Sequence, residues 1–277
     1  MRNLSIVATV AIVAVVASCG DRRSYPARNF TWTGDIAAGS TVNIRNIDGA
    51  IAIVPSANEK LSVDAVIMNA PASAVQVKQS SNGNNVYFCT LLGSRTADGC
   101  ENTEGKHDTH FSPLSLFNRH HPITVRYTVH VPAGVSVSVE TVSGKIAAQD
   151  IDGNVKASSV NGDVTVSTTK GTVNAETVNG SIVASMASLP DSGNVHLETV
   201  NGSITSLLPE GIGGSIDLEN TNGTITANYP NAVQDKDDKH HMRIKLDEGQ
   251  RRVTVETVNG SVNLAKYVKV PTVSLQN

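Results

Sequence analysis

The chain has 277 residues and a formal net charge of −3, from 22 basic and 25 acidic residues. This balance excludes the strongly basic surface that is typical of nucleic-acid-binding proteins, so no nucleic-acid partner is expected. Only 4 % of the residues are aromatic and 39 % are hydrophobic, and this composition favours a thin, β-rich repeat over a bulky globular core. An elongated repeat also accommodates this length as one body.

The N-terminus has the features of an export signal. Residues 1–18 contain one cation, Arg2, and an apolar run from Leu4 to Val16. The run is shorter than the roughly 20 residues that span a bilayer, so it indicates a secretory signal peptide. Its last residues and the next one, Val-Ala-Ser-Cys at 16–19, resemble the bacterial lipobox. This resemblance implies lipidation of Cys19; an ordinary signal peptide that ends in cysteine and an uncleaved anchor are the alternatives.

The residues after Cys19 bear on where the protein is anchored. In Gram-negative lipoproteins an aspartate directly after the lipidated cysteine favours the inner membrane, and in this chain Gly20 holds that place. An outer-membrane location is therefore expected if the cell has such a membrane, and the lipid at Cys19 makes the membrane the first partner. Residues 19–29 are polar and include Pro26, which predicts a tether.

A glycine recurs every nine residues in the middle of the chain. The second and fourth positions after each glycine are apolar, and the seventh position is apolar in all units but one. Each unit closes with Asn-Gly, Asp-Gly or Lys-Gly, which indicates a short strand followed by a tight corner. The glycines of this block are Gly144, Gly153, Gly162, Gly171 and Gly180.

The full repeat is 18 residues long, because alternate units end in nearly the same word. These words are ETVSG, SSVNG, ETVNG, ETVNG, ENTNG and ETVNG. An early copy of the pattern lies at residues 42–53. We therefore expect one repeat domain over residues 30–270, with polar insertions at about 80–122 and 231–248.

Two folds suit such units: stacked β-hairpins and a solenoid of parallel strands. Asn-Gly between β-rich segments is a strong hairpin signal. In a hairpin that turns at Asn201-Gly202, however, Val200 would lie opposite Ser203 and Leu197 opposite Ser206. Neither face of such a hairpin would form an apolar core. Register therefore disfavours hairpins, which remain the alternative.

Stacking whole coils removes this conflict. Val155 then lies near Val173, and Val160 near Val178, at the roughly 4.8 Å spacing of neighbouring strands. Both pairs are expected to form apolar columns inside the coil. The predicted fold is all-β, a single-stranded β-solenoid, or β-helix, of about 18-residue coils.

Two polar residue types recur with the repeat. The corner asparagines are expected to form a structural column: Asn161, Asn179, Asn201, Asn222 and Asn259. Glutamate recurs four residues before the corner glycine, at Glu140, Glu176, Glu198, Glu219 and Glu256. Stacked glutamates form a row of like charges that attracts cations or basic partners, or a solvated rim that keeps the sheet soluble. The solvated rim is the simpler interpretation.

The segment 80–122 interrupts the repeat and contains Cys89 and Cys100. In an exported protein this pair predicts a disulfide, worth about 3 kcal/mol by loss of chain entropy; a reactive thiol is the alternative. The segment also holds four histidines that are weak candidates for metal ligands. Their spacing matches no zinc motif, so a solvated polar loop is the simpler interpretation. These are His107, His110, His120 and His121.

One stretch is similar to a known family. Residues 123–153 read ITVRYTVHVPAGVSVSVETVSGKIAAQDIDG, an alternating strand, a turn at Val131-Pro132 and Gly134, and further strands closed by Ser143-Gly144 and Asp152-Gly153. This pattern resembles the bacterial putative-adhesin family, whose domains have no established function. The resemblance covers about residues 43–265 without the cysteine segment. It implies a β-solenoid and supplies no catalytic residue.

These observations predict a protein that is not an enzyme and has no cofactor. The sequence contains no G-x-S-x-G, P-loop, dinucleotide-binding or HExxH motif, and its nonapeptide lacks the paired glycines of calcium-binding repeats. We expect a lipid-anchored cell-envelope protein that serves as an adhesin or interaction scaffold with protein or glycan partners. An envelope ligand-binding, metal-binding or sensing module is the alternative, and a β-helix carbohydrate-active enzyme is a weaker one.

Overall fold

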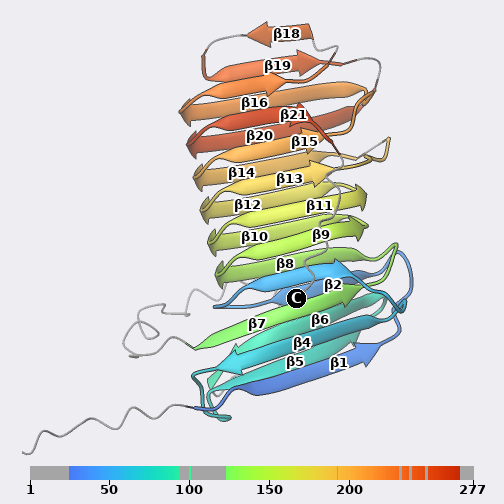
Figure 1. The fold of residues 1–277 in the computed structure, drawn as a ribbon, viewed down its shortest axis with the longest axis vertical. Helices are drawn as coiled ribbons and strands as arrows, with labels where there is room; N and C mark the ends of the chain where they lie inside the picture. Colours follow the sequence, from blue (N-terminus) through green and yellow to red (C-terminus); the bar gives the residue numbers. More distant parts are fainter. Residues whose placement is uncertain are drawn as a thin grey trace, which may run out of the picture.

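The computed structural model describes residues 25–93, 100, 123–191, 193–230, 233–236, 239–246 and 249–268. Within these ranges every regular element is a β-strand, and the strands form two sheets, which we call sheet A and sheet B. The strands stack one above another along the long axis of the molecule, as Figure 1 shows. The predicted all-β fold is confirmed.

The strands of each sheet follow a spatial order that differs from their order in the chain. From one edge to the other, sheet A consists of β1 (Arg28–Gly34), β4 (Leu61–Met68), β7 (Thr124–Val131), β3 (Ile51–Pro55), β9 (Ile146–Asp152), β11 (Val164–Lys170), β13 (Ile182–Met186), β15 (Ile204–Leu208), β21 (Val262–Lys266) and β17 (Ile225–Asn228). Sheet B consists of β18 (Val233–Lys236), β19 (His241–Lys245), β16 (Gly214–Asn222), β20 (Arg251–Asn259), β14 (Val195–Asn201), β12 (Val173–Asn179), β10 (Val155–Asn161), β8 (Ser136–Ser143), β2 (Thr41–Arg45), β6 (Asn85–Leu92) and β5 (Val75–Asn82).

Consecutive coils stack in parallel and in register. Strand β10 lies between β8 and β12, and Val155 lies opposite Val137 on one side and Val173 on the other. The nine-residue units alternate between the sheets, so each 18-residue coil adds one strand to sheet B and one to sheet A. This pairing confirms the solenoid and rules out hairpins at the Asn-Gly corners. The early copy at 42–53 forms β2 and β3, which stack on β8 and β9.

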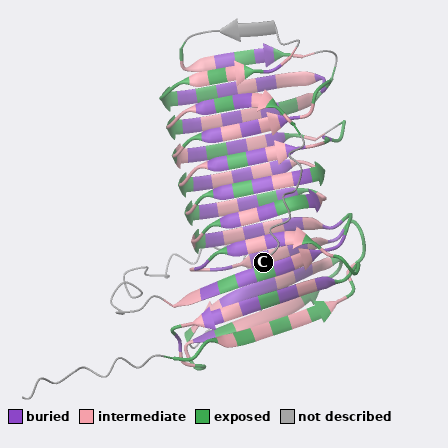
Figure 2. Ribbon diagram, viewed as in Figure 1, coloured by how far each residue is buried: buried purple, intermediate pink, exposed green. Residues whose placement is uncertain are grey.

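The core lies between the two sheets. Along most strands alternate residues point inward, which Figure 2 shows as buried segments that alternate with intermediate or exposed ones. Sheet B contributes one buried column and sheet A another, and stacking leaves almost none of their side chains accessible. The columns are Val42, Val137, Val155, Val173, Val195, Val253 and Ile216 in sheet B, and Ile51, Ile146, Val164, Ile182, Ile204 and Val262 in sheet A.

The expected inward orientation of Val160 and Val178 is wrong. Val160 is 42 % exposed and Val178 is 41 % exposed, because strict alternation along the strand places the preceding residue inside. The inward residue next to Val178 is Thr177, whose hydroxyl donates a hydrogen bond to the carbonyl oxygen of Gly162 at 3.0 Å. A threonine satisfies a corner carbonyl there, and valine cannot do so.

Ile151 occupies the same sequence position as Val160 but is buried. The difference comes from a β-bulge in β9, where the pairing with β11 shifts between Ala148 and Ile151. Asp150 lies in the bulge with a φ of 51°, and its backbone N–H donates to the hydroxyl of Ser167 at 2.7 Å. One extra residue thus reverses the direction of the side chains that follow.

The last coil does not occupy the last place in the stack. Strand β20 lies between β14 and β16, and β21 lies between β15 and β17. The C-terminal coil therefore inserts between two coils that precede it in the sequence. The coil that contains β16 and β17 is joined to the rest of the parallel stack through this inserted coil.

Antiparallel strands extend both sheets at one end of the stack and sheet B alone at the other. At the N-terminal end, β1, β4 and β7 extend sheet A, and β5 and β6 extend sheet B. Phe88 on β6 is fully buried, with its ring centroid 5.3 Å from that of Trp32. At the other end, the hairpin of β18 and β19 closes sheet B. The segments expected as insertions, about 80–122 and 231–248, thus contribute strand β6 and this hairpin.

The corner asparagines hydrogen-bond to one another through their side-chain amides. Asn179 donates to Asn161 at 2.9 Å, and Asn201 donates to Asn179 at 2.9 Å. The inserted coil continues the series, because Asn259 donates to Asn201 at 2.8 Å and accepts from Asn222 at 2.9 Å. The amides form one ladder whose spatial order differs from the sequence order at its end.

The buried columns predict how the chain responds to a charge. Val155→Asp places an unpaired carboxylate in the core between two coils, and we expect it to lower the free energy of unfolding by more than about 3 kcal/mol. Val160→Asp on the same strand serves as the matched control, because its side chain points to solvent, and should cost less than about 1 kcal/mol. Chemical denaturation followed by circular dichroism measures both; equal losses would contradict the assigned orientation.

The amide ladder predicts a smaller and local effect. Asn179→Ala removes one donor and one acceptor at an exposed corner, so we expect a loss of about 1 kcal/mol in the free energy of unfolding. Amide hydrogen exchange should show faster opening near the corners of the two adjoining coils and unchanged protection in the N-terminal sheets. A loss as large as that of Val155→Asp would mean that the ladder, rather than the core, holds the stack together.

Candidate interaction surface

Four glutamates form an uninterrupted row on the outer face of sheet B. Glu176 pairs in register with Glu198, Glu198 with Glu256, and Glu256 with Glu219. These residues come from β12, β14, β20 and β16, so their backbones are about 4.8 Å apart from one strand to the next. We call these four residues the glutamate row. The inserted C-terminal coil makes it continuous by placing Glu256 between Glu198 and Glu219.

Within the described residues, the glutamate row has few basic side chains as direct partners. The imidazole of His196 lies 3.3 Å from the carboxylate of Glu198. Farther toward the N-terminal end, Arg45 lies 3.3 Å from Glu140, and Ser158 separates Glu140 from Glu176. Among the residues that the structure describes, no ion pair involves Glu176 or Glu256. The row therefore presents excess negative charge to solvent.

A row of valines runs beside the glutamates, two residues further along each strand. Two residues of a strand span about 7 Å, so the two rows lie side by side on the same face. We call these residues the valine row. Its most exposed members are Val142 (40 %), Val160 (42 %), Val178 (41 %) and Val258 (41 %), with Val200 between the last two.

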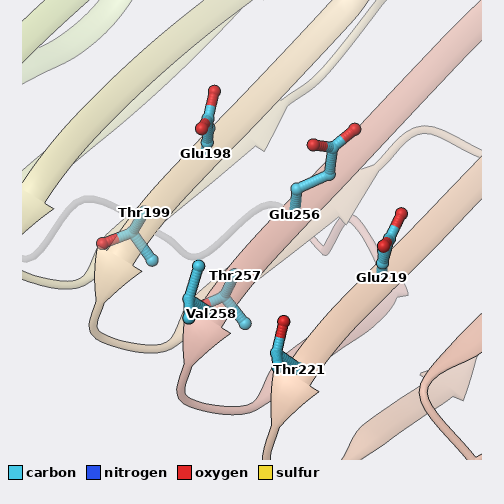
Figure 3. Close-up of a pocket in the computed structure, with 7 residues that line it drawn as sticks. All are labelled: Glu198, Thr199, Glu219, Thr221, Glu256, Thr257 and Val258. Carbon is cyan, nitrogen blue, oxygen red and sulfur yellow. The ribbon is translucent and has the colours of Figure 1, made fainter.

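The two rows meet at a shallow hollow over the inserted coil. Its lining comes from three neighbouring strands, and Figure 3 shows the three carboxylates pointing away from the sheet while Val258 and Thr221 lie nearer the corner. The carboxylates project side by side from one flat face and do not converge on a common point. The lining residues are Glu198, Thr199, Glu219, Thr221, Glu256, Thr257 and Val258.

Arg45 on β2 and the imidazole of His241 on β19 lie at the level of the glutamates, in register with Glu140 and Glu219. The other basic residues on this face lie elsewhere along the strands. Lys156 and Arg252 are exposed near the starts of β10 and β20, before the level of the glutamates. On β20 the charge therefore changes along the strand direction, from Arg252 to Glu256 and then to the uncharged Val258 and Asn259.

The outer face of sheet A differs in chemistry. Along β13 and β15 the outward positions are Val183, Ser185, Thr205 and Leu207, none of which is charged. Val183 is 38 % exposed, comparable to the valines of sheet B. The combination of a charged row with an apolar row is thus specific to sheet B among these coils.

One corner carboxylate outside the glutamate row has a shifted pKa. The backbone N–H of Ser181 donates to Asp163 at 3.1 Å, and this hydrogen bond lowers the pKa of the Asp163 carboxyl. Lys145 lies 3.4 Å away and lowers the pKa further. Asp163 therefore links three successive coils at a corner, which is a structural role.

A buried polar cluster lies near the N-terminal end of the stack. The hydroxyl of Thr90 donates to the Asn46 side chain at 2.9 Å and lies 2.8 Å from the hydroxyl of Tyr127. Burial raises the pKa of Tyr127, so the phenol stays neutral. Asn46 in turn donates to the carbonyl oxygen of Val125 at 2.7 Å. The cluster is closed to solvent and its hydrogen bonds hold together three segments of the chain.

The other residues singled out in the sequence do not form a site on this face. Cys89 and Cys100 form a disulfide with their Cα atoms 5.8 Å apart, at the N-terminal end of the stack. Cys19 lies outside the described residues. So do the weak metal candidates His107, His110, His120 and His121.

Within the described ranges, no group of three or more His, Cys, Asp or Glu side chains is arranged to hold a metal ion. No helix found in the described part of the chain has the length and apolar character needed to cross a membrane.

The valine row was missed in the sequence because its residues were assigned to the core. The signal was nevertheless present in the word ETVNG, where strict alternation places Glu and Val on one face and Thr on the other. The glutamate row was recognised correctly as an outer row. Its continuity could not be foreseen, because it depends on the insertion of the C-terminal coil.

A comparison with solved structures finds proteins from three bacteria. A protein from Clostridium sporogenes, described as a putative cell adhesion protein, is 11 % identical, with 87 % of this chain and 100 % of that chain covered and a TM-score of 0.49. A putative adhesin from Bacteroides fragilis is 9 % identical, with 86 % and 97 % covered and a TM-score of 0.40. A putative adhesin from Parabacteroides merdae is 9 % identical, with 87 % and 97 % covered and a TM-score of 0.20.

No match was found among curated proteins. A family model, described as Toastrack DUF4097, matches residues 31–265. This match spans both sheets from β1 to β21 and leaves out residues 1–30. The chain therefore belongs to the Toastrack DUF4097 family.

Proposed function

We propose that this protein is a non-enzymatic, lipid-anchored protein of the cell envelope that acts as an adhesin or interaction scaffold. Its working part is the outer face of sheet B, where the glutamate row and the valine row run side by side. The observation that carries this proposal is their repetition on adjacent strands: four carboxylates in register, beside valines that are about 40 % exposed.

The form of this surface favours binding over catalysis. Hydrolases and lyases built on β-helices need acidic groups that face a substrate from different directions or share a cation in a cleft. In this protein Glu198, Glu256 and Glu219 project side by side from one flat sheet. A row of equivalent carboxylates has no member with a distinct acid or base role, whereas it suits a partner with a repeated contact pattern.

The N-terminal sequence supports attachment to a membrane. Cys19 follows a short apolar segment and closes a lipobox-like sequence, and the repeat domain begins only after a polar tether. A lipid at Cys19 would hold the stack near the membrane while leaving its long faces accessible to other proteins or glycans. A single acyl chain gives weak attachment, so the multiple chains of a bacterial lipoprotein are needed for a stable anchor.

Protease shaving of intact cells tests the surface-exposed part of this proposal. We expect an added protease to cleave the protein on intact cells and a periplasmic marker protein to remain whole. Full protection on intact cells, with cleavage after lysis, would exclude an adhesive role outside the cell. The Cys19→Ala variant is the matched control for anchoring and should be lost from the membrane fraction; its retention there would contradict lipidation at this residue.

A further inference from the structure

We propose that the outer face of sheet B binds a protein through an amphipathic α-helix whose cationic stripe contacts the glutamate row and whose apolar stripe contacts the valine row. This inference deepens the proposed function, because it rests on the same surface and states the chemistry of the partner. The contact surface consists of Glu176, Glu198, Glu256, Glu219, Val178, Val200 and Val258.

The charge of the glutamate row favours a basic partner. Adjacent glutamates at strand spacing repel one another, and each like-charged cross-strand pair is destabilising. Four successive strands nevertheless carry them, and Glu176 and Glu256 have no ion pair in the described part of the chain. A row of lysine or arginine side chains would relieve this repulsion. Nucleic acids and anionic lipid surfaces would increase it, which leaves a basic protein as the complementary partner.

The valine row indicates that the partner also has an apolar side. Strand propensity alone does not require valine at these outward positions, since threonine is equally β-branched and equally favoured in strands. Threonine does fit there, because Thr221 follows Glu219 at the same place in β16. Valines on several adjacent strands instead form a continuous apolar stripe that remains exposed in the isolated chain, as expected for a surface that a partner covers.

The spacing of the rows matches an α-helix. Four glutamates on adjacent strands span about 14 Å along the stack, from three spacings of roughly 4.8 Å. Three turns of an α-helix rise about 16 Å, so one cation per turn stays within reach of one glutamate per coil. An extended strand along the same direction repeats its side chains about every 6.6 Å and would lose this match after two coils. The glutamate and valine rows, about 7 Å apart, also match two stripes on one side of a helix about 10 Å wide.

The test uses the full chain in a non-ionic detergent and a fluorescein-labelled helical peptide of about 18 residues. The peptide carries one lysine per turn, a leucine stripe beside the lysines, and alanine and glutamine elsewhere. We expect saturable binding by fluorescence anisotropy that weakens as salt is added, because the charge contacts are exposed. A peptide of the same composition in shuffled order should bind at least about tenfold more weakly. Equal binding of both peptides would overturn the proposal.

Matched variants of the protein separate this surface from general attraction to a negative chain. Glu176→Gln with Glu256→Gln should weaken binding about tenfold. Glu59→Gln with Asp64→Asn removes the same charge from exposed positions outside the glutamate row and should change binding less than about twofold. Similar losses for both pairs would show that net charge alone draws the peptide, and would overturn the proposal.

The apolar row has its own pair of variants. Val178→Thr with Val258→Thr keeps branching at Cβ, so the strands remain intact while the apolar stripe is interrupted. We expect this change to weaken binding several-fold. Val183→Thr, on the exposed face of sheet A, should leave binding unchanged. If Val178→Thr with Val258→Thr does not weaken peptide binding, the part of the proposal that assigns the valine row is overturned.

Peptide binding and protease shaving test separate claims, so a negative result in one does not decide the other. Peptide binding together with protection on intact cells would retain the helix-binding surface and place it inside the envelope. Cleavage on intact cells together with no peptide binding would retain a surface protein and reject the helix as its partner.

Discussion

The structure depends on backbone contact at the glycine corners. A Cβ atom at Gly202 would lie 1.9 Å from the carbonyl oxygen of Gly180, and one at Gly180 would lie 2.2 Å from that of Gly162. Any side chain at these corners would therefore separate the coils. Because glycine lets the corners touch, the backbone N–H of Gly180 also donates to the carbonyl oxygen of Asn201 at 3.0 Å. Stacking in register follows, and apart from the bulge in β9 the strand residues of one coil lie over their equivalents in the next.

Register turns a repeated sequence into rows of like side chains. The inward threonine illustrates this, since Thr199 donates to the carbonyl oxygen of Gly180 at 2.8 Å, as Thr257 does to Gly202 at 2.9 Å. The glycine corner thus exposes a carbonyl to the interior, and the hydroxyl three residues before the next corner satisfies it. A buried carbonyl without a partner is costly. The same word, ETVNG, therefore places a charge and a valine outside, a hydroxyl inside and an amide at the corner.

The features that could be predicted from the sequence are those that the repeat pattern alone determines. The nine-residue period predicted the two sheets, the parallel pairing and the asparagine ladder, because these depend only on coils stacking in register. Val160 points outward because strand alternation outweighs the hydrophobicity of its side chain. Ile151 is buried because of a bulge at Asp150, and no sequence motif predicts this bulge. The insertion of β20 and β21 between earlier coils is beyond local reasoning, since all ETVNG coils are nearly equivalent neighbours.

The near-equivalence of the coils limits the kind of site that the outer face of sheet B can form. Because the coils share one sequence pattern, a residue that occurs once per coil forms a row along the sheet. A site that needs different groups facing one another is difficult to build on such a sheet. The inserted coil strengthens this tendency, because Glu256 lies between Glu198 and Glu219 in the glutamate row and Val258 extends the valine row by one strand. On such a face, specificity depends on the spacing of side chains along each row and on the order of the charged and apolar rows. The partner proposed above would be selected by matching a period of about 4.8 Å over the four strands of the glutamate row.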